Sequence, residues 1–472
     1  MTPPHPDNEN RPVAALLAPD ILALLEEAPG SVAEETEEMH PADLADVAGA
    51  MPRERVIGFL SALPAERAAE VLSYLPEELR IEVLEEMSAP EAAALVTEMT
   101  PDDRADVLEE LEEDVADDIL DEMPVEERTE TEQLAAYDPE TAGGLMTTEF
   151  VSAPEGMTAE SALAGVRAVA RSGRREAMHA VYVTDRAGTL RGVVSLRALL
   201  AAPDGARLAD VTHLDVLTVP PSASQEDVAR MFEKYDLVAV PVVDERRRIL
   251  GIVTVDDVID VIQEEATEDV QKLGGMEAID ESYMAVGFGT MIRKRAGWLC
   301  ALFVGELFTA TVMARFEGEL SRALVLTLFI PLIVSSGGNS GSQATSLIIR
   351  AMALQEVRLR DWWRVAVREL PTGLTLGAIL GVIGVARVLL WQSMGLYDYG
   401  AHYVPIAFTV GIAVLGVVTF GSLAGSMLPF VLRRVGFDPA SASAPFVATL
   451  VDVTGLAIYF TVALLLLRGT ML

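Results

Sequence analysis

The chain has 472 residues, 51% of them hydrophobic, and a formal net charge of −37. This length allows two or three domains, and so strong a negative charge argues against nucleic acid as a partner. One cysteine, Cys300, excludes an intrachain disulfide, and five scattered histidines show no zinc-like spacing.

The charge is distributed unevenly along the chain. Residues 291–472 contain 14 basic and 9 acidic side chains, a net charge of +5, which leaves −42 for residues 1–290. A soluble part this acidic repels itself and is expected to bind counter-ions. Because the N-terminal stretch MTPPHPDNENRP has no basic segment followed by an apolar one, residues 1–290 are not expected to be exported by a signal peptide.

Residues 1–40 are predicted to be a polar extension with a short helix, and residues 41–136 an acidic, all-α superhelical domain. Prolines recur in this domain, most of them 11 to 14 residues apart, at Pro41, Pro52, Pro64, Pro76, Pro90, Pro101 and Pro124. Proline suits the first turn of a helix, so each one is expected to begin a new short helix. Pairs of such helices stack into a small solenoid, and its polar face carries the acids.

Residues 137–204 and 205–269 form two similar α/β halves. The first contains MHAVYVTDRAGTLRGVVSLRALL and the second LVAVPVVDERRRILGIVTVDDVI, each a strand, a turn, a second strand and a helix. This internal symmetry resembles a pair of CBS domains, which implies a regulatory module that commonly binds adenine nucleotides such as ATP. The chain has no Walker-type phosphate loop and no Ser-His-Asp or Cys-His set, so we predict neither an enzyme nor an ATP-driven pump.

The last helix of the second half continues as VDDVIDVIQEEATEDVQKLGGM toward a predicted connecting (plug) helix over residues 270–295. At roughly 100° per residue, five of its acids fall within an arc of about 140°, namely Asp257, Asp260, Glu264, Glu265 and Glu268. Like charges on one face destabilise a helix unless a cation neutralises them, and carboxylates favour Mg²⁺ or Ca²⁺. A plain solvated face is the alternative; three acidic surfaces in one chain favour bridging ions.

Residues 296–472 contain five apolar segments. They predict an α-helical membrane domain of five spans, at roughly 296–314, 323–349, 370–390, 405–432 and 440–467. Basic clusters precede the first span, separate the second from the third, and separate the fourth from the fifth. Since positively charged loops stay in the cytoplasm, we expect cytoplasmic acidic domains and an outside C-terminus, in a bacterial-type inner membrane.

The second and fifth spans carry polar residues. The second contains SSGGNSGSQATS, whose Asn339 and Gln343 offer oxygen acceptors, and the fifth places Asp452 near its centre. An ionised side chain at mid-membrane costs roughly 2.5–3.5 kcal/mol and normally faces a water-filled path or a partner. A structural acid in a helix bundle and small-residue helix packing are the alternatives. Two helices make too thin a pore in one chain, so we predict a homodimer that pairs them.

With this domain order, and with the motifs PLIVSSGGNSGSQ and FDPASASAPFVATLVDVTGL, the chain resembles the MgtE family of magnesium channels and transporters over nearly its full length. The resemblance implies a homodimer with a pore ion site at Asp452, beside Asn339, Ala444 and Ala448. It further implies that intracellular Mg²⁺ holds the closed state through Glu70, Asp102, Asp106, Glu226, Asp236, Asp257, Asp260, Glu265, Glu268, Asp269 and Asp438. The sequence departs from the family pattern at Ser335 and Ala444.

The predicted function is therefore Mg²⁺ influx down the electrochemical gradient, through a channel that intracellular Mg²⁺ closes. Without Mg²⁺ the acidic domains repel one another; with it, carboxylates from separate domains share ions and the assembly compacts. Two alternatives stay open: an exchanger of Mg²⁺ against Na⁺ or H⁺, and a metal or nucleotide sensor that transports nothing. Oxygen ligands alone do not distinguish Mg²⁺ from Mn²⁺, Co²⁺ or Ca²⁺.

Overall fold

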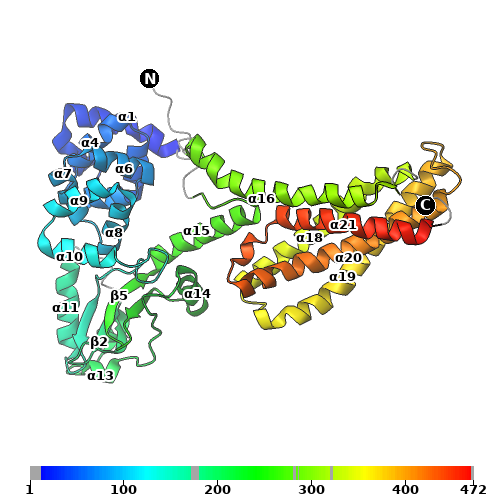
Figure 1. Ribbon diagram of the computed structural model, residues 1–472. Helices are drawn as coiled ribbons and strands as arrows, with labels where there is room; N and C mark the ends of the chain where they lie inside the picture. Colours follow the sequence, from blue (N-terminus) through cyan, green and yellow to red (C-terminus); the bar gives the residue numbers. More distant parts are fainter. Residues whose placement is uncertain (1–11, 172–179, 280–282, 285, 319–322, 469–472) are drawn as a thin grey trace. The chain divides into compact units, whose positions relative to one another are not determined.

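The chain forms two compact units, Met1–Gln263 and Glu264–Leu472. Short helices make up the N-terminal part of the first unit, strands and helices its remainder, and long helices the second unit (Figure 1). This computed structural model describes residues 12–171, 180–279, 283–284, 286–318 and 323–468.

Short helices follow one another through the N-terminal part of the first unit. They are α1 (Pro12–Glu27), α2 (Val32–Glu35), α3 (Pro41–Gly49), α4 (Arg53–Ser61), α5 (Ala65–Ser73), α6 (Glu77–Glu86), α7 (Ala89–Thr97), α8 (Pro101–Glu110), α9 (Glu113–Glu122) and α10 (Val125–Leu134). Proline stands at the N-cap or in the first turn of α3 to α8 and of α10. There its fixed φ suits the helix and its missing N–H costs nothing. The predicted proline-started helices are confirmed.

These helices pack in two rows around one hydrophobic core. In one row α3 packs on α5, α5 on α7 and α7 on α9; in the other, α4 packs on α6, α6 on α8 and α8 on α10. Fully buried core side chains include Leu44, Phe59, Leu60, Leu72, Leu84 and Ile119. Ala18, Ile21 and Val32 belong to the same core. Residues 12–40 are therefore part of this domain and not a separate polar extension; residues 1–11 lie outside the described residues.

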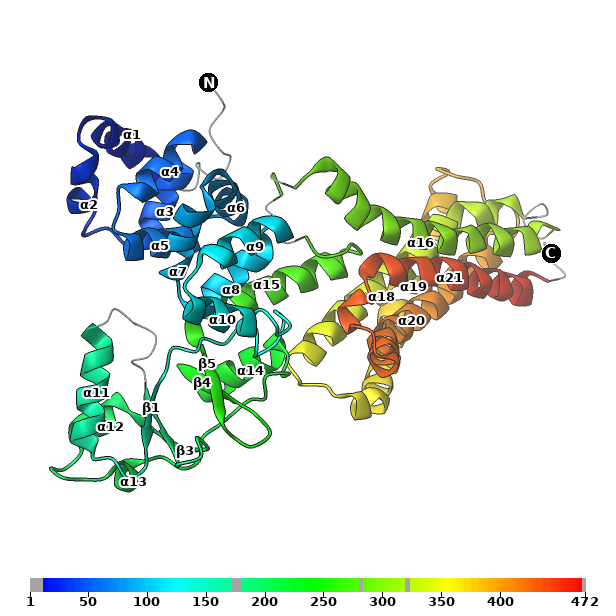
Figure 2. The same cartoon turned by 60° about the vertical axis from the view of Figure 1, so that its left-hand side comes forward.

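The remainder of the first unit contains two small sheets of similar design (Figure 2). Its elements are β1 (Val151–Pro154), α11 (Ala159–Arg171), β2 (Ala180–Thr184), β3 (Leu190–Ser195), α12 (Leu196–Ala201), α13 (Leu208–Val211), α14 (Gln225–Tyr235), β4 (Ala239–Val243), β5 (Ile249–Thr254) and the first part of α15 (Val255–Leu273), up to Gln263. β1 pairs parallel with β2, while β2–β3 and β4–β5 are antiparallel pairs. Both antiparallel pairs shift register at the same place, next to Val183 and Val242. The predicted internal symmetry is confirmed.

The glycines of the two Gly-Val-Val and Gly-Ile-Val repeats allow close backbone contacts. A Cβ atom on Gly192 would lie 2.6 Å from the carbonyl oxygen of His213, and one on Gly251 would lie 2.6 Å from that of Thr147. Such distances are far below van der Waals contact, so only glycine fits both positions. The repeated glycine therefore marks equivalent points of the two halves.

The segment before β1 packs with the second sheet. Ala142 and Met146 share a core with Val240 and Val253, and the N–H of Thr147 donates a hydrogen bond to a β5 carbonyl at 2.8 Å. The predicted division at residue 205 therefore follows the sequence repeat. In the packing, however, the residues that begin the first repeat belong to the hydrophobic core of the second.

Within its described residues, the second unit holds five helices that are long and apolar enough to cross a membrane. They are α16 (Phe288–Arg315), α18 (Ile330–Ala353) with the preceding 3-10 turn η4 (Leu324–Phe329), α19 (Trp362–Ser393) with η5 (Leu359–Asp361), α20 (Tyr403–Val435), and α21 (Ala444–Leu467), which follows η6 (Pro439–Ser441). α18 packs against both α20 and α21, and α16 packs against α21. The predicted five spans are confirmed, and each helix is longer than, or within a few residues of, the segment predicted for it.

Glycines let α18 and α20 touch backbone to backbone. A Cβ atom on Gly421 would lie 2.3 Å from the carbonyl oxygen of Gly337, and one on Gly425 would lie 2.2 Å from that of Gly341. Small residues at such spacing are typical of tightly packed membrane helices. Part of the glycine-rich second span therefore serves helix packing, the alternative considered above.

The segment predicted as a connecting helix is not one continuous helix. α15 ends at Leu273, Gly275 adopts a left-handed φ of +77°, and α16 begins only at Phe288. Glycine is the residue that takes this φ without strain, so it ends the helix. Residues 280–282 and 285 lie outside the described residues, and the basic residues 293–295 belong to the first turns of α16.

Candidate ion sites

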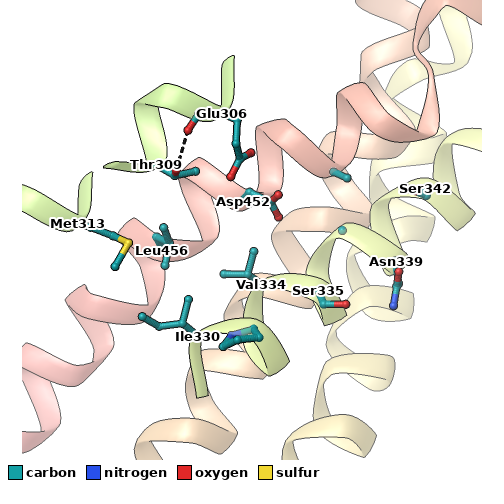
Figure 3. A pocket seen from close by; sticks show the side chains of 13 residues that line it. Glu306, Thr309, Met313, Ile330, Val334, Ser335, Asn339, Ser342, Asp452 and Leu456 are labelled. Atoms are coloured by element: carbon teal, nitrogen blue, oxygen red, sulfur yellow. Dashed lines mark hydrogen bonds between the residues drawn. The ribbon is translucent and has the colours of Figure 1, made fainter. Parts of the chain in front are cut away.

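A pocket of about 480 Å³ lies among α16, α18 and α21 (Figure 3). Asp452, Asn339 and Ala448, three of the four residues predicted for the pore ion site, line it. Ala444, the fourth, stands one turn before Ala448, and its carbonyl oxygen accepts a hydrogen bond from Ser342 Oγ at 3.2 Å. Ser342 itself lines the pocket. Folding thus brings the polar parts of the second and fifth spans to one cavity.

Helical periodicity sorts the small and polar residues of α18 onto two faces. Four small or polar residues of α18, each three or four positions from another member of the set, line the pocket, namely Ser335, Gly338, Asn339 and Ser342. Those spaced four apart pack on α20, namely Gly337, Gly341 and Thr345. Residues three and four apart share a face of a helix. The motif therefore provides both a polar lining for the pocket and a packing surface for α20. The sequence alone left these two interpretations open.

Glu306 of α16 also lines this pocket and was not predicted. Figure 3 shows its carboxyl group pointing toward Asp452. The signal was present in the sequence, because Glu306 is an acid inside the first apolar segment, 296–314. The cost of an intramembrane charge applies to it as it does to Asp452.

A second group of acids lies in the first unit, on α8 and α15. Asp102 is 5% exposed, and its Oδ1 has no hydrogen-bond partner. Burial, and then the charge of Asp103, raise the pKa of Asp102 to about 7. Burial and then Asp102 raise the pKa of Asp257 well above its usual range, although Thr254 Oγ1 donates a hydrogen bond to Asp257 Oδ2 at 2.7 Å.

Neighbouring acids enlarge this group. Burial raises the pKa of Asp103, and burial together with the charge of Asp256 raises that of Asp260. Neither Asp103 nor Asp256 was predicted as a ligand. Desolvation and then Asp102 raise the pKa of Asp106 to about 7, but its side chain is exposed, so water screens part of this shift. The name acidic cluster is used below for Asp102, Asp103, Asp106, Asp256, Asp257 and Asp260.

The acidic cluster has the composition of a site for a hard cation. Carboxylates that crowd together in a partly buried place hold protons unless a cation replaces them. Mg²⁺ takes one or two carboxylates directly and keeps its other ligands as water. Among the described residues, no three His, Cys, Asp or Glu side chains stand close enough to hold a bare metal ion.

Comparison with known families covers most of the chain. The model of the MgtE family, a divalent cation transporter, matches residues 330–462, that of the MgtE intracellular N domain matches 39–140, and that of the CBS domain matches 142–205 and 208–264. The magnesium transporter MgtE of Thermus thermophilus is 43% identical over 342 residues, which are 72% of this chain and 73% of that protein. The chain belongs to the MgtE family.

Other members and a solved structure agree with this assignment. The magnesium transporter MgtE of Enterococcus faecalis is 37% identical over 343 residues, 73% of each chain. A crystal structure of the soluble part of a magnesium transporter covers 54% of this chain and 99% of its own, with 32% identity and a TM-score of 0.51. The family consists of transporters and not enzymes. The predicted fold, a superhelical domain, a CBS pair and five apolar helices, is confirmed.

The remaining ligands that the family resemblance implied are not members of the acidic cluster as defined above, although Glu70 lies close to it. Glu226 pairs with Arg230 on α14. Asp236 ends the same helix in a left-handed conformation, φ +50°. Burial and then the charges of Asp103, Asp256 and Glu70 raise the pKa of Tyr74. Glu265 and Asp269 lie on α15. Their role as metal ligands stays a prediction.

A lysine stands between two of the predicted ligands. Lys272 Nζ lies 2.6 Å from Glu268 Oε1 and 2.8 Å from Asp438 Oδ2. Partial burial lowers the pKa of Lys272, but the hydrogen bonds to Asp438 and Glu268 outweigh it and hold the pKa above its usual value. Both carboxylates therefore already have a cation, one that the chain itself supplies.

Proposed function

We propose that this protein is a Mg²⁺ channel that admits Mg²⁺ down its electrochemical gradient through the pocket at Asp452. One observation carries the proposal: an acid in the middle of an apolar helix lines a pocket that polar residues of α18, Ser335, Asn339 and Ser342, also line. The related proteins of Thermus thermophilus and Enterococcus faecalis are magnesium transporters. An acid in that position normally serves an ion path.

The pocket suits a hydrated ion. Mg²⁺ gives up its waters reluctantly, and six waters at about 30 Å³ each occupy about 180 Å³, less than the pocket volume of about 480 Å³. The hydroxyl and amide groups of Ser335, Asn339 and Ser342 supply acceptors for the ion's water protons. In this mechanism Asp452 attracts the ion through its hydration shell.

We further propose that two copies of the chain pair their second and fifth spans to form the complete pore. α18 and α21 contact each other, and a symmetric pairing places two Asp452 side chains at one level. The basic residues 293–295 at the start of α16 support a cytoplasmic first unit and an outside C-terminus. An inside-negative potential of 100 mV then drives entry with roughly 4.6 kcal/mol per divalent ion.

We propose that the acidic cluster senses intracellular Mg²⁺. Its crowded carboxylates repel one another in the absence of a cation, and Oδ1 of the buried Asp102 lacks a partner that a bound ion or its water supplies. A ligand shifts a conformational equilibrium by its differential affinity for the two states. Mg²⁺ binding that draws α8 and α15 together therefore favours a compact, closed state.

Flux through full-length protein in liposomes, measured against internal Mg²⁺, tests this proposal. We expect Mg²⁺ entry at low internal Mg²⁺ and its suppression at millimolar internal Mg²⁺. Discrete single-channel openings in a bilayer support a channel, whereas obligatory counter-flow of Na⁺ or H⁺ supports the exchanger. Liposomes that pass no Mg²⁺ under any condition support the sensor that transports nothing.

We propose that the pair of CBS domains, residues 142–205 and 208–264, binds an adenine nucleotide. A solved structure of the cytosolic domain of a Mg²⁺ channel MgtE contains ATP; it is 38% identical and covers 52% of this chain and 99% of its own, at a TM-score of 0.49. For the present chain, equilibrium dialysis of the full-length protein with labelled ATP measures the affinity directly.

Lys272 is expected to reduce the Mg²⁺ sensitivity of the gate. Lys272→Met frees Glu268 and Asp438, each 36–39% exposed, for a shared Mg²⁺. A unit charge at 4 Å contributes about 1 kcal/mol in water, so the internal Mg²⁺ concentration that halves the flux is expected to fall roughly fivefold. Lys272→Arg keeps the charge and is the matched control. If the internal Mg²⁺ concentration that halves the flux instead rises in Lys272→Met, this role is contradicted. The ion pairs of Lys272 then stabilise the closed state.

A further inference from the structure

The pocket at Asp452 contains a second acid, from a helix that the proposed pore does not otherwise use. Of the thirteen residues that line the pocket, Glu306 and Asp452 are the two with charged side chains, and none is Lys, Arg or His. Glu306 lies on α16 and Asp452 on α21. The pair therefore has no basic partner within the pocket lining.

Local packing holds the two helices together at this level. A Cβ atom on Gly305 would lie 3.0 Å from Thr449 Cγ2, so the glycine beside Glu306 lets α16 approach α21 one turn before Asp452. Thr309 Oγ1 donates a hydrogen bond to the Glu306 carbonyl oxygen at 2.6 Å, which satisfies this hydroxyl within its own helix. The Glu306 carboxyl group then points toward Asp452 (Figure 3).

Two carboxylates in one apolar environment cannot both stay ionised without a counter-charge. A single monovalent cation leaves one negative charge uncompensated, and burying an unpaired charge is costly. One divalent cation balances both carboxylates at once. The charge of the pocket in each protomer therefore matches that of one divalent ion when both acids take part, and the proposed pair of protomers contains two such pockets.

We propose that Glu306 is the second carboxylate of the pore ion site and gives the site its preference for divalent over monovalent cations. This inference rests on the proposed function, because it presumes that ions pass the pocket at Asp452. Both carboxylates accept hydrogen bonds from the ion's water shell, so the ion enters and leaves without losing its waters. Asp452 and Glu306 then hold it from two sides, α21 and α16.

Full-length protein in liposomes tests the proposal with Glu306→Gln, which keeps the shape and removes the charge. We expect the Mg²⁺ concentration for half-maximal flux to rise at least tenfold, and the permeability to Na⁺ relative to Mg²⁺ to rise by a similar factor. Glu306→Asp restores the charge and is expected to recover most of the divalent preference. The matched control is Glu369→Gln, since Glu369 is an acid of α19 that does not line the pocket.

The outcomes separate this inference from the proposed function. Unchanged Mg²⁺ saturation and unchanged Na⁺ permeability in Glu306→Gln overturn the role of Glu306, even where Asp452→Asn abolishes flux. Wild-type flux in Asp452→Asn overturns the pore site itself. Glu306→Ala is the second variant should Glu306→Gln not accumulate, and the change in ion preference is a readout that a loss of folded protein does not produce.

Discussion

Asp452→Asn is expected to lower Mg²⁺ flux at least a hundredfold while the protein still inserts and folds. The substitution removes the carboxylate that lines the pocket between α18 and α21, and Asn is uncharged, so the attraction for a divalent ion is lost. A loss of about 2.8 kcal/mol of attraction for the ion corresponds to a hundredfold lower flux, since about 1.4 kcal/mol is tenfold. A neutral side chain is also easier to bury in the membrane.

The measurement is Mg²⁺ entry into liposomes at low internal Mg²⁺, with protein amount and elution volume matched to wild type. Asp398→Asn is a suitable control, because Asp398 lies in the loop between α19 and α20, where it accepts hydrogen bonds from Gly400 and Gln392. Flux at the wild-type rate in Asp452→Asn removes the basis of the proposed pore.

The stability of the Mg²⁺-free first unit is expected to fall as the pH rises from about 4 to about 7. The pKa of Asp102 is about 7 in the folded chain against 3.8 ordinarily. In this window the unfolded chain has released the proton that the folded chain still holds, so ionisation favours unfolding. About three pKa units correspond to roughly 4 kcal/mol, and each kilocalorie per mole lowers the melting temperature by roughly 2–4 °C in a domain of this size.

Mg²⁺ is expected to reverse this loss, and more so at pH 8 than at pH 5.5, because it binds carboxylates that have lost their protons. Calorimetry of the full-length protein with and without Mg²⁺ measures the transition, and hydrogen exchange at α8 and α15 localises it. All four tryptophans lie in the second unit, so tryptophan fluorescence does not report on this cluster.

The double variant Asp102→Asn with Asp257→Asn supplies the control for this linkage. Its melting temperature is expected to depend less on pH, and to rise less with Mg²⁺, because two of the acids with raised pKa values no longer titrate. A first unit whose stability rises from pH 4 to pH 7 without Mg²⁺ contradicts the assigned electrostatics. Mg²⁺ stabilisation that persists unchanged in the double variant contradicts the sensor role.

Local rules explain why so much of the fold was predictable from the sequence. Proline restricts its own φ wherever it stands, so Pro41, Pro64 and Pro101 mark helix starts without reference to any distant residue. Apolar segments long enough to span a bilayer are equally local. Within α18, the spacing of Ser335, Asn339 and Ser342 places them on one face through helix geometry alone. These features are properties of short stretches of chain.

The sequence also determined that Asp452 needs a partner or an aqueous path, because the cost of a charge in the membrane does not depend on the fold. It did not determine what that surrounding is. Glu306 precedes Asp452 by more than a hundred residues, and only the packing of α16 on α21 brings the two carboxyl groups together. Lys272 and Asp438 meet in the same way. Contacts between distant segments depend on helix packing registers, which side-chain shapes set jointly across several helices, and no single stretch of sequence contains them.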